Sequence, residues 1–528
     1  MAEESVGDAG TQHLGYFTGV WSPDGCAILA HGYTGALHLW RRQPGGGGRW
    51  VPEPALGGHY GPVVDACWAA DGACLLTVSA DQTARLSTAL APGGHWCELA
   101  RPQVHGHDFA CVAALPQLRD APGCFLYASG SEEKVIRVFQ GPQAFADTLA
   151  LARGFEPAQP PAAAVAGGHM IEVLGATLPA LGLSNKAVYA LEEEDADANE
   201  EGEEGGGLLG GYTHGPDLAP ASAVPAAVSG PPLEEHLAQN TLWPEIHKLY
   251  GHGNDLFALA ADPQGQYLAS ACRAQAPDVA AVWLWDTRRW TGAGVLAAHT
   301  LTVTQLAFSP SGDALASASR DRGVALFARQ ETGGGGSGGS PDAGPPFRLV
   351  GRVAKAHGRI VWGLDWSPDG LLIATGSRDA SVKLWSCRAG IRAGGEGAGA
   401  ALVLPEAPAA SLSLPDSVRA VAFAPVCRPG RLYHLAVGLE DGSLQLLRVW
   451  FSGGCEDSAP PVAAEAAPVW QSSPFMQHAA AVRRLCWRRR EESEAGARGS
   501  ADYLMASVGE DHAVRVFAID AALLDPAA

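Results

Sequence analysis

The chain has 528 residues, with 36 Lys or Arg and 56 Asp or Glu, which gives a formal net charge of −20 at pH 7. This acidic balance argues against a surface that is coated by nucleic acid, because contact with a phosphate backbone requires a strong local excess of cations. The 11 cysteines include no C-x-x-C pair, which argues against a zinc ribbon and a disulfide framework. We expect reduced thiols, as in cytosolic or nuclear proteins.

The chain begins with the acidic, polar residues Met1–Ser5, so we expect no secretory signal. No uninterrupted apolar run reaches the roughly 18 residues that a membrane span needs. The sequence therefore predicts a soluble protein of the cytoplasm and nucleus that does not contact a membrane.

A unit of roughly 40–45 residues recurs along the chain. Its clearest copy begins at His357 and continues through Trp366–Gly370, an apolar stretch at Leu371–Ser377, Arg378-Asp379 and the end Val382–Trp385. Period-2 alternation of apolar residues is typical of short antiparallel strands. Such units are typical of WD40 β-propeller blades, which bury their faces only by stacking on neighbours. The sequence therefore predicts an all-β WD40 β-propeller.

Nine units of unequal quality follow one another. In chain order they are Leu14–Trp40, the units that begin at His59 and His107, a degenerate unit at Leu178–Tyr189, the units that begin at His252, His299 and His357, a unit that ends near Leu447, and the unit that begins at His478. The start histidines at 59 and 107 lie 48 residues apart, and those at 252 and 299 lie 47 apart. This regular spacing supports the assignment.

Three segments interrupt the units. Glu192–Glu204 holds nine acidic residues and precedes an Ala/Pro-rich stretch that ends at Pro232. Dense like charge with low hydrophobicity cannot offset the entropy cost of folding, so we expect a disordered insertion over 192–232, with a docking tail as the alternative. Gly-rich composition predicts flexible loops at 330–346 and 388–402.

A set of polar residues recurs at fixed places in the units. The unit resembles the WD40 family, in which the opening His, a strand Ser or Thr, a turn Asp and a closing Trp form a buried hydrogen-bond chain. This resemblance implies a complete tetrad of His357, Thr375, Asp379 and Trp385. It also implies three incomplete tetrads, which lack the Trp and retain three members each. They are His299, Ser317 and Asp321; His478, Ser507 and Asp511; and His59, Thr77 and Asp81.

Recurrent Ser, His and Asp residues raise the alternative of a hydrolase. A nucleophile site needs one such set beside an oxyanion hole in a pocket, whereas this set repeats from unit to unit. Histidines on different blades lie too far apart to share a metal ion. The stretch Gly45–Gly48 lacks the Lys-Ser/Thr and the strand–helix context of a phosphate loop. We therefore expect no catalytic residue, metal or cofactor.

Three arginines are candidates for partner binding. Arg320 and Arg378 precede the turn Asp on adjacent units, and Arg359 follows His357 by two residues. Positions of this kind face the narrow rim of a propeller, where three guanidinium groups can hold phosphate or a carboxylate-rich segment. The alternative is that each Arg pairs with its neighbouring Asp. A further arginine cluster, Arg483-Arg484 and Arg488–Arg490, is followed by Glu491-Glu492, so we expect a self-paired, solvated loop, with partner binding as the alternative.

Several segments differ from generic repeat sequence. They are Ala100–His107, Leu178–Tyr189, Leu233–His252, His299–Phe308 and Gly509–Phe517. In this order they resemble the WD40 subunit of the Elongator complex, and the resemblance extends from about Leu14 to Phe517. That subunit is larger and has two seven-bladed propellers.

The resemblance implies a domain organisation. It implies a disordered N-terminus at 1–13, the remnant last blade of an N-terminal propeller at 14–48, a seven-bladed propeller at 49–520 and a tail at 521–528. The chain would then lack most of the first propeller, as a truncated gene model, a fragment or a shortened variant.

The resemblance also implies a role. It implies a non-catalytic scaffold that bridges the Elongator scaffold subunit and the catalytic radical-SAM/acetyltransferase subunit, in support of 5-carboxymethyl-type modification of the tRNA wobble uridine. One alternative is direct contact with tRNA phosphate through Arg320, Arg359 and Arg378. Another is a generic WD40 adaptor, such as a ubiquitin-ligase substrate receptor.

Overall fold

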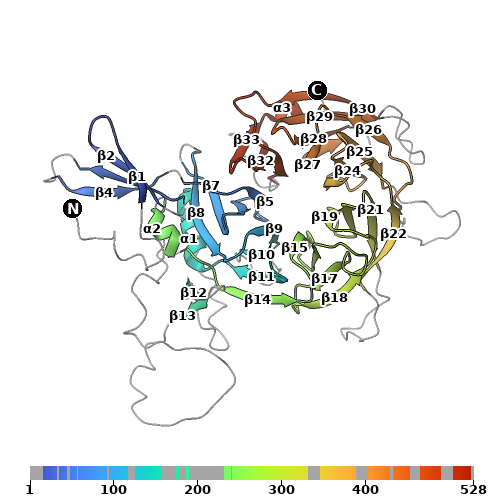
Figure 1. Ribbon diagram of the computed structural model, residues 1–528, viewed down its shortest axis with the longest axis horizontal. Helices are drawn as coiled ribbons and strands as arrows, with labels where there is room; N and C mark the ends of the chain where they lie inside the picture. Colours follow the sequence, from blue (N-terminus) through green and yellow to red (C-terminus); the bar gives the residue numbers. More distant parts are fainter. Residues whose placement is uncertain are drawn as a thin grey trace, which may run out of the picture. The chain divides into compact units, whose positions relative to one another are not determined.

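The computed structural model describes most of the chain. The described residues are 16–32, 35–43, 48–55, 57–91, 94–116, 125–156, 173–177, 186–189, 231–239, 241–330, 345–387, 402–428, 432–451, 464–488 and 503–524. They form β-strands with three short helices (Figure 1). The predicted disordered N-terminus at 1–13 lies outside the described residues, and so do most residues of the predicted disordered or flexible segments 192–232, 330–346 and 388–402.

The chain divides into two compact units. Unit 1 comprises Met1–Gly57, Arg85–His105 and Phe139–Ile246, and unit 2 comprises Gly58–Ala84, Gly106–Val138 and His247–Ala528.

Seven antiparallel sheets follow one another from residue 63 to residue 519. The first two have the orders β5-β6-β7-β8 and β9-β10-β11-β14. Their strands are β5 (Val63–Trp68), β6 (Leu75–Ser79), β7 (Thr83–Ala89), β8 (Trp96–Val104), β9 (Phe109–Leu115), β10 (Leu126–Ser131), β11 (Val135–Gln140) and β14 (Glu245–Tyr250).

The next three sheets are β15-β16-β17-β18, β19-β20-β21-β22 and β23-β24-β25-β26. Their strands are β15 (Leu256–Ala261), β16 (Tyr267–Cys272), β17 (Val282–Asp286), β18 (Thr291–Leu296), β19 (Val303–Phe308), β20 (Ala314–Ser319), β21 (Val324–Arg329), β22 (Phe347–Val353), β23 (Val361–Trp366), β24 (Leu372–Ser377), β25 (Ser381–Ser386) and β26 (Ala410–Ser413).

The last two sheets are β27-β28-β29-β30 and, within the described residues, the three-stranded β31-β32-β33. Their strands are β27 (Val418–Arg428), β28 (Leu432–Leu439), β29 (Leu444–Phe451), β30 (Ala464–Gln471), β31 (Val482–Trp487), β32 (Tyr503–Gly509) and β33 (Val514–Ile519). The short helix α3 (Ala521–Leu524) follows β33.

The first strands of these sheets form a closed cycle within unit 2. Contacts run from β5 to β9, β15, β19, β23, β27 and β31, and from β31 back to β5, around the common centre visible in Figure 1. Closure of this kind is how propellers protect most of their sheet edges. The predicted all-β class of propeller-like sheets is confirmed.

Each first strand carries an irregularity at its second residue. The register of its pairing with the second strand skips one residue there, as in a β-bulge. The seven skipped residues are Val64, Ala110, Phe257, Thr304, Trp362, Arg419 and Arg483. A bulge turns its side chain away from the regular alternation of the strand. The first strands of all seven sheets therefore share the same local distortion.

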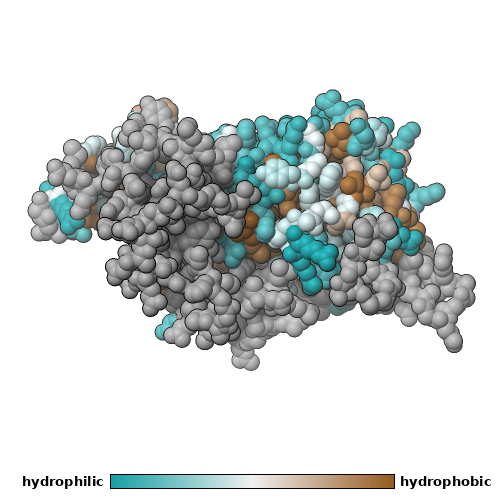
Figure 2. All heavy atoms as spheres, turned by 90° about the horizontal axis from the view of Figure 1, so that it is seen from below, coloured by the Kyte–Doolittle hydropathy of each residue, from teal (hydrophilic) through white to brown (hydrophobic). Residues whose placement is uncertain are grey.

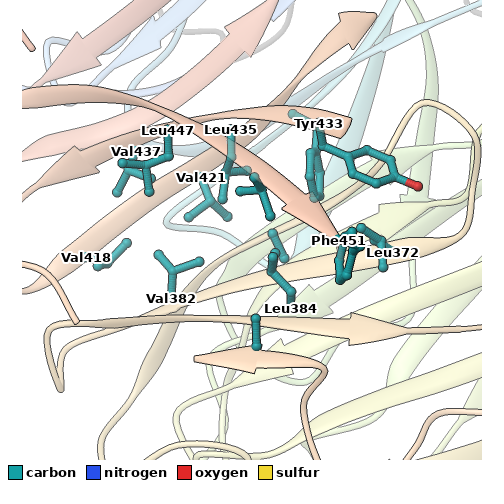
Figure 3. Packing of buried hydrophobic residues seen from close by; sticks show 14 of the residues in the cluster. Leu372, Val382, Leu384, Val418, Val421, Tyr433, Leu435, Val437, Leu447 and Phe451 are labelled. Carbon is teal, nitrogen blue, oxygen red and sulfur yellow. The ribbon is translucent and has the colours of Figure 1, made fainter. Parts of the chain in front are cut away.

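The hydrophobic core lies between neighbouring sheets. All residues of β20 and β24 are buried, because these second strands are covered on both faces. Figure 3 shows one cluster, in which Leu372 and Leu384 pack against Tyr433, Leu435 and Phe451 of the following sheet. On the side shown in Figure 2, the described surface is mainly hydrophilic with small hydrophobic patches.

Unit 1 contains a separate four-stranded sheet. Its strands are β1 (Tyr16–Trp21), β2 (Ala27–Gly32), β3 (Leu37–Arg42) and β4 (Trp50–Glu53), in that order. The sequence predicted that this sheet ends at residue 48. Strand β4 lies beyond that residue, because Trp50 on β4 pairs with Arg42 on β3. The strand β1 is exposed along its whole length.

Unit 1 also contains the segment between β11 and β14. Its elements are α1 (Gln143–Ala152), β12 (Val173–Thr177), β13 (Lys186–Tyr189) and α2 (Glu234–Gln239). Of the degenerate repeat predicted at Leu178–Tyr189, residues 178–185 lie outside the described residues, and the remainder forms β13, which pairs with β12 in a two-stranded sheet. The fourth strand beside β11 is β14, which follows the long segment. No helix in the described part of the chain has the length and apolar character to cross a bilayer.

Candidate functional site

The complete tetrad lies in the sheet β23-β26. His357, in the loop before β23, lies 2.8 Å from Thr375 Oγ1 on β24 through Nε2, and 3.3 Å from Asp379 Oδ2 through Nδ1. Trp385 on β25 donates its indole N–H to Thr375 Oγ1 at 2.9 Å. These side chains tie the loop and two strands of one sheet together.

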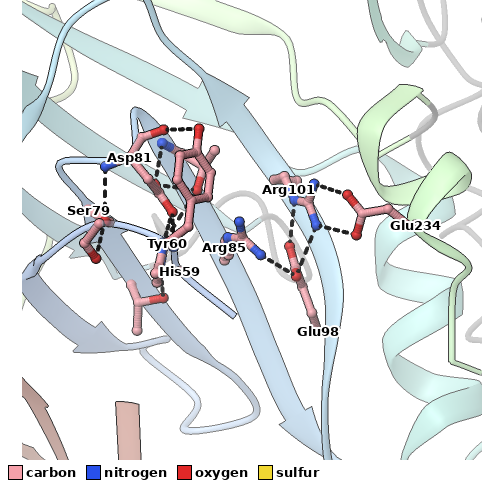
Figure 4. Close-up of polar contacts among 11 residues, drawn as sticks. His59, Tyr60, Ser79, Asp81, Arg85, Glu98, Arg101 and Glu234 are labelled. Atoms are coloured by element: carbon pink, nitrogen blue, oxygen red, sulfur yellow. Dashed lines mark hydrogen bonds and ion pairs between the residues drawn. The ribbon is translucent and has the colours of Figure 1, made fainter. Parts of the chain in front are cut away.

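Three other sheets have the same arrangement without the indole. The His Nε2 to hydroxyl distance is 2.9 Å for His59–Thr77, 2.8 Å for His299–Ser317 and 2.8 Å for His478–Ser507. The His Nδ1 to carboxylate distance is 2.8 Å for His59–Asp81, 3.1 Å for His299–Asp321 and 2.7 Å for His478–Asp511. Figure 4 shows the pair His59–Asp81 together with Tyr60, whose hydroxyl donates to the Asp81 carbonyl.

The Asp of each tetrad fixes a tight turn. Asp379 accepts backbone N–H bonds from Gly358 at 2.8 Å and Ser381 at 3.1 Å. The residue after the Asp has a positive φ in all four sheets, at Gln82, Arg322, Ala380 and His512. Such backbone is uncommon for residues other than glycine, so the carboxylate helps to hold a conformation that the residue itself disfavours.

Burial determines the chemistry of the tetrads. His357 is 3% exposed and Thr375 is fully buried. Burial lowers the pKa of His357 to about 4, although Asp379 opposes the shift. Burial raises the pKa of Asp379, but hydrogen bonds from Ser381 and Gly358 hold it below its usual value. A neutral imidazole and a covered hydroxyl suit a structural network, because a nucleophile must reach its substrate.

A further tetrad-like group, absent from the sequence analysis, lies in the sheet β15-β18. His252 Nε2 lies 2.7 Å from Ser270 Oγ, and Trp285 donates to the same oxygen at 2.8 Å. The interval of 18 residues between His and Ser matches His59–Thr77, His299–Ser317 and His357–Thr375 and was a usable signal. Ala274 stands where the Asp is expected, and His252 Nδ1 has no hydrogen-bond partner within the described residues.

One predicted unit start differs in the structure. The sequence indicated Gly106-His107 as the opening of the third unit, but His107 is exposed and His105 is buried. The Gly-His dipeptide therefore marks the loop correctly but does not identify the buried imidazole.

The candidate binding arginines lie on the turns and loops of two adjacent sheets. Arg320 and Arg378 occupy the turns before β21 and β25, Arg359 lies in the loop before β23, and all three are exposed. Arg322, which the sequence analysis missed, is exposed in the same turn as Arg320. We refer to Arg320, Arg322, Arg359 and Arg378 as the arginine patch.

Two hydrogen bonds place the arginine patch on one side of unit 2. The Arg322 carbonyl accepts from His357 N at 3.3 Å, which sets this turn beside the loop that holds Arg359. The Arg359 carbonyl accepts from Ser377 Oγ at 3.4 Å, and Ser377 directly precedes Arg378. The four guanidinium groups therefore project from consecutive, hydrogen-bonded segments.

The turn aspartates have other partners than the neighbouring arginines. Asp321 Oδ2 lies 3.5 Å from Arg352 Nη2 in addition to its contact with His299. Within the described residues, neither Arg320 nor Arg378 forms an ion pair with the Asp that follows it. The alternative that Arg320 and Arg378 pair with their neighbouring Asp does not hold among the described residues.

The second arginine cluster also differs from expectation. Arg484 pairs with Asp65 on β5 at 2.5 Å, and Arg483 pairs with Glu510 at 2.9 Å. Both arginines thus bind acids on other segments of the chain; Arg489, Arg490, Glu491 and Glu492 lie outside the described residues. The predicted self-pairing therefore does not hold for Arg483 and Arg484, because the packing of neighbouring sheets and the turn after β32 supply other acids.

Comparison with known proteins supports this architecture. The family described as WD domain, G-beta repeat matches residues 50–86, 243–274, 291–327 and 350–386. The matches at 291–327 and 350–386 begin in the last strand of one sheet and end in the third strand of the next.

Longer similarity extends over nearly the whole chain. It is 40% identical to Elongator complex protein 2 of Arabidopsis thaliana over 525 residues, which is 97% of this chain and 57% of the relative. Its identity to Elongator complex protein 2 is 35% for Homo sapiens and 36% for Drosophila melanogaster, over 98% of this chain in both cases.

The chain is a WD40-repeat homologue of Elongator complex protein 2. It spans 60% of the human relative's length and 59% of the Drosophila relative's length. This similarity confirms the resemblance predicted from the connecting segments.

Proposed function

We propose that this chain is a non-catalytic assembly subunit of an Elongator-type complex, present in cytoplasm and nucleus. In this role it bridges the scaffold subunit and the catalytic radical-SAM/acetyltransferase subunit, and so supports 5-carboxymethyl-type modification of the tRNA wobble uridine. The observation that carries the proposal is the similarity to Elongator complex protein 2 along 97% of the chain. The closed cycle of sheets and the buried tetrads also support it, because the hydroxyl groups of the tetrads are covered and cannot reach a substrate.

Co-purification tests this proposal. The tagged chain is incubated with the scaffold and catalytic subunits from its own source, separately and together. We expect both subunits to be retained at near-equal amounts, and an excess of untagged chain to displace them. Loss of retention for both subunits under low-salt conditions would overturn the proposal.

The arginine patch supports a second candidate function, direct contact with tRNA phosphate. Four exposed guanidinium groups on adjacent segments, none with an ion pair inside the described part of the chain, suit a phosphate backbone. Such a contact would add affinity for tRNA without reading its sequence, since phosphate contacts position a nucleic acid and do not specify it.

Charge reversal separates this candidate from the first. We expect the triple substitution Arg320→Glu, Arg359→Glu, Arg378→Glu to weaken tRNA binding by about tenfold or more and to reduce its salt dependence. The matched control is Arg288→Glu, Arg289→Glu, Arg348→Glu, which changes net charge equally at exposed arginines elsewhere. Fluorescence anisotropy with labelled tRNA measures both. Equal effects of the two variants would exclude a specific role for the arginine patch.

A further inference from the structure

Two adjacent glutamates of the helix α2 bind two different strands within unit 1. Glu234 forms a bidentate ion pair with Arg101 on β8, at 2.6 Å to Nη1 and 2.9 Å to Nη2 (Figure 4). Glu235 Oε1 lies 2.9 Å from His38 Nδ1 on β3. A helix of only six residues thus connects β8 with the sheet β1-β4.

The contact with β8 is buried and multiple. Arg101 also binds Glu98 through Nε at 2.8 Å, and Glu98 accepts from Arg85 at 3.0 Å. These four side chains are only 6–9% exposed. Two arginines and two glutamates balance in charge, so their attraction and hydrogen bonds can offset the desolvation cost of burying them.

Further hydrogen bonds strengthen the same junction. Thr241 Oγ1 accepts from Arg101 N at 2.9 Å and donates to the Leu237 carbonyl at 2.8 Å. Trp243 N donates to the Pro102 carbonyl at 2.9 Å. The end of α2 and the chain that follows it are therefore fixed along β8.

The contact with the sheet β1-β4 is weaker. His38 and Glu235 are 16% and 28% exposed, and they share a single short contact. The imidazole is stacked on Trp40 with ring centres 5.8 Å apart, and Tyr16 packs edge-on against it at 5.4 Å. Breaking a partly exposed ion pair costs little free energy, whereas removing one partner of a buried pair leaves an unpaired buried charge and costs much more.

We propose that α2 is a clamp that holds the sheet β1-β4 to strand β8. The contact of Glu234 with β8 is the stable one, and the contact of Glu235 with the sheet β1-β4 breaks first. The sheet can then separate from α2 while α2 stays on β8, whereas loss of α2 from β8 releases both. This ordered release concerns the internal mechanics of unit 1 and is independent of the proposed function.

Hydrogen–deuterium exchange of the full chain tests the order of release. Glu235→Gln should raise exchange in β1–β4 several-fold and leave α2 unchanged. Glu234→Gln and Arg101→Met should each raise exchange in both α2 and β1–β4. Glu53→Gln is the matched control, since it removes the exposed pair Arg41–Glu53 inside the same sheet, and it should change neither element.

Exchange in β24 checks that each variant remains folded. The clamp is refuted if Glu234→Gln or Arg101→Met loosens α2 without loosening β1–β4, or if Glu235→Gln leaves β1–β4 fully protected. Both results are read without any partner protein, so they cannot be confused with failure of the co-purification experiment.

Discussion

Arg484→Met should destabilise unit 2 by about 3–5 kcal/mol, because it leaves the buried carboxylate of Asp65 without its cation. Asp65 is 2% exposed and lies 2.5 Å from Arg484 Nε. Its other oxygen accepts from Val112 N on β9 at 3.0 Å. This carboxylate therefore connects the last sheet of the cycle with the first and second sheets.

The position of the pair explains the size of the effect. Strands β31 and β5 meet where the two ends of the cycle join. Trp68 on β5 donates its indole N–H to the Cys486 carbonyl on β31 at 3.3 Å. Loss of the ion pair therefore weakens the junction on which closure depends.

Urea unfolding of the single and double variants measures the effect. We expect Asp65→Asn and Arg484→Met each to lower the midpoint strongly. The double variant should recover much of the loss, because no unpaired charge then remains buried. A double variant whose loss equals the sum of the single losses would show that the two groups do not stabilise each other.

Acidification from pH 6.5 to pH 4 should also destabilise the chain markedly. Burial lowers the pKa of His252, His357 and His434 to about 4 in each case. In the unfolded chain these imidazoles take up protons near their ordinary pKa of about 6.5. Between the two values the unfolded state binds more protons than the folded state, so stability falls as the pH falls.

The carboxylates of the tetrads act in a lower range. Hydrogen bonds lower the pKa of Asp379 and Asp511 against the effect of burial, so their stabilisation is lost only as the pH falls below the usual carboxyl range. The histidines therefore dominate between pH 6.5 and 4. Each contributes up to about 3 kcal/mol across this window.

Urea midpoints measured from pH 7.5 to pH 4.5 test this expectation. His357→Gln should be less stable than the unsubstituted chain at pH 7.5, because it disturbs the tetrad, but its stability should depend less steeply on pH. Identical slopes for the two proteins would contradict a neutral, buried His357.

Local spacing made much of the fold accessible from the sequence. An interval of 18 residues from His to Ser or Thr and of 22 residues to Asp lies within one loop and two neighbouring strands, as for His357, Thr375 and Asp379. The same rule finds His252 and Ser270, where Ala274 replaces the Asp. His478 and Ser507 lie 29 residues apart, because a longer connection joins their strands.

Other features depend on contacts that spacing does not encode. Arg484 and Asp65 are 419 residues apart, and nothing in their local sequence marks them as partners. Arg101 and Glu234 are 133 residues apart and meet only because α2 returns to β8. The strand-like alternation of Leu178–Tyr189 predicted a blade, but a blade also needs neighbouring strands, which this segment lacks within the described residues.

The offset between repeats and sheets has a consequence for how such a chain can change in length. Each matched repeat at 291–327 and 350–386 contributes its first strand to the preceding sheet and its other strands to the next one. When one whole repeat is duplicated or lost, every sheet therefore keeps a last strand, since the first strand of the next repeat completes the preceding sheet. Gain or loss of a whole repeat is thus the least disruptive way to change the number of sheets in the cycle.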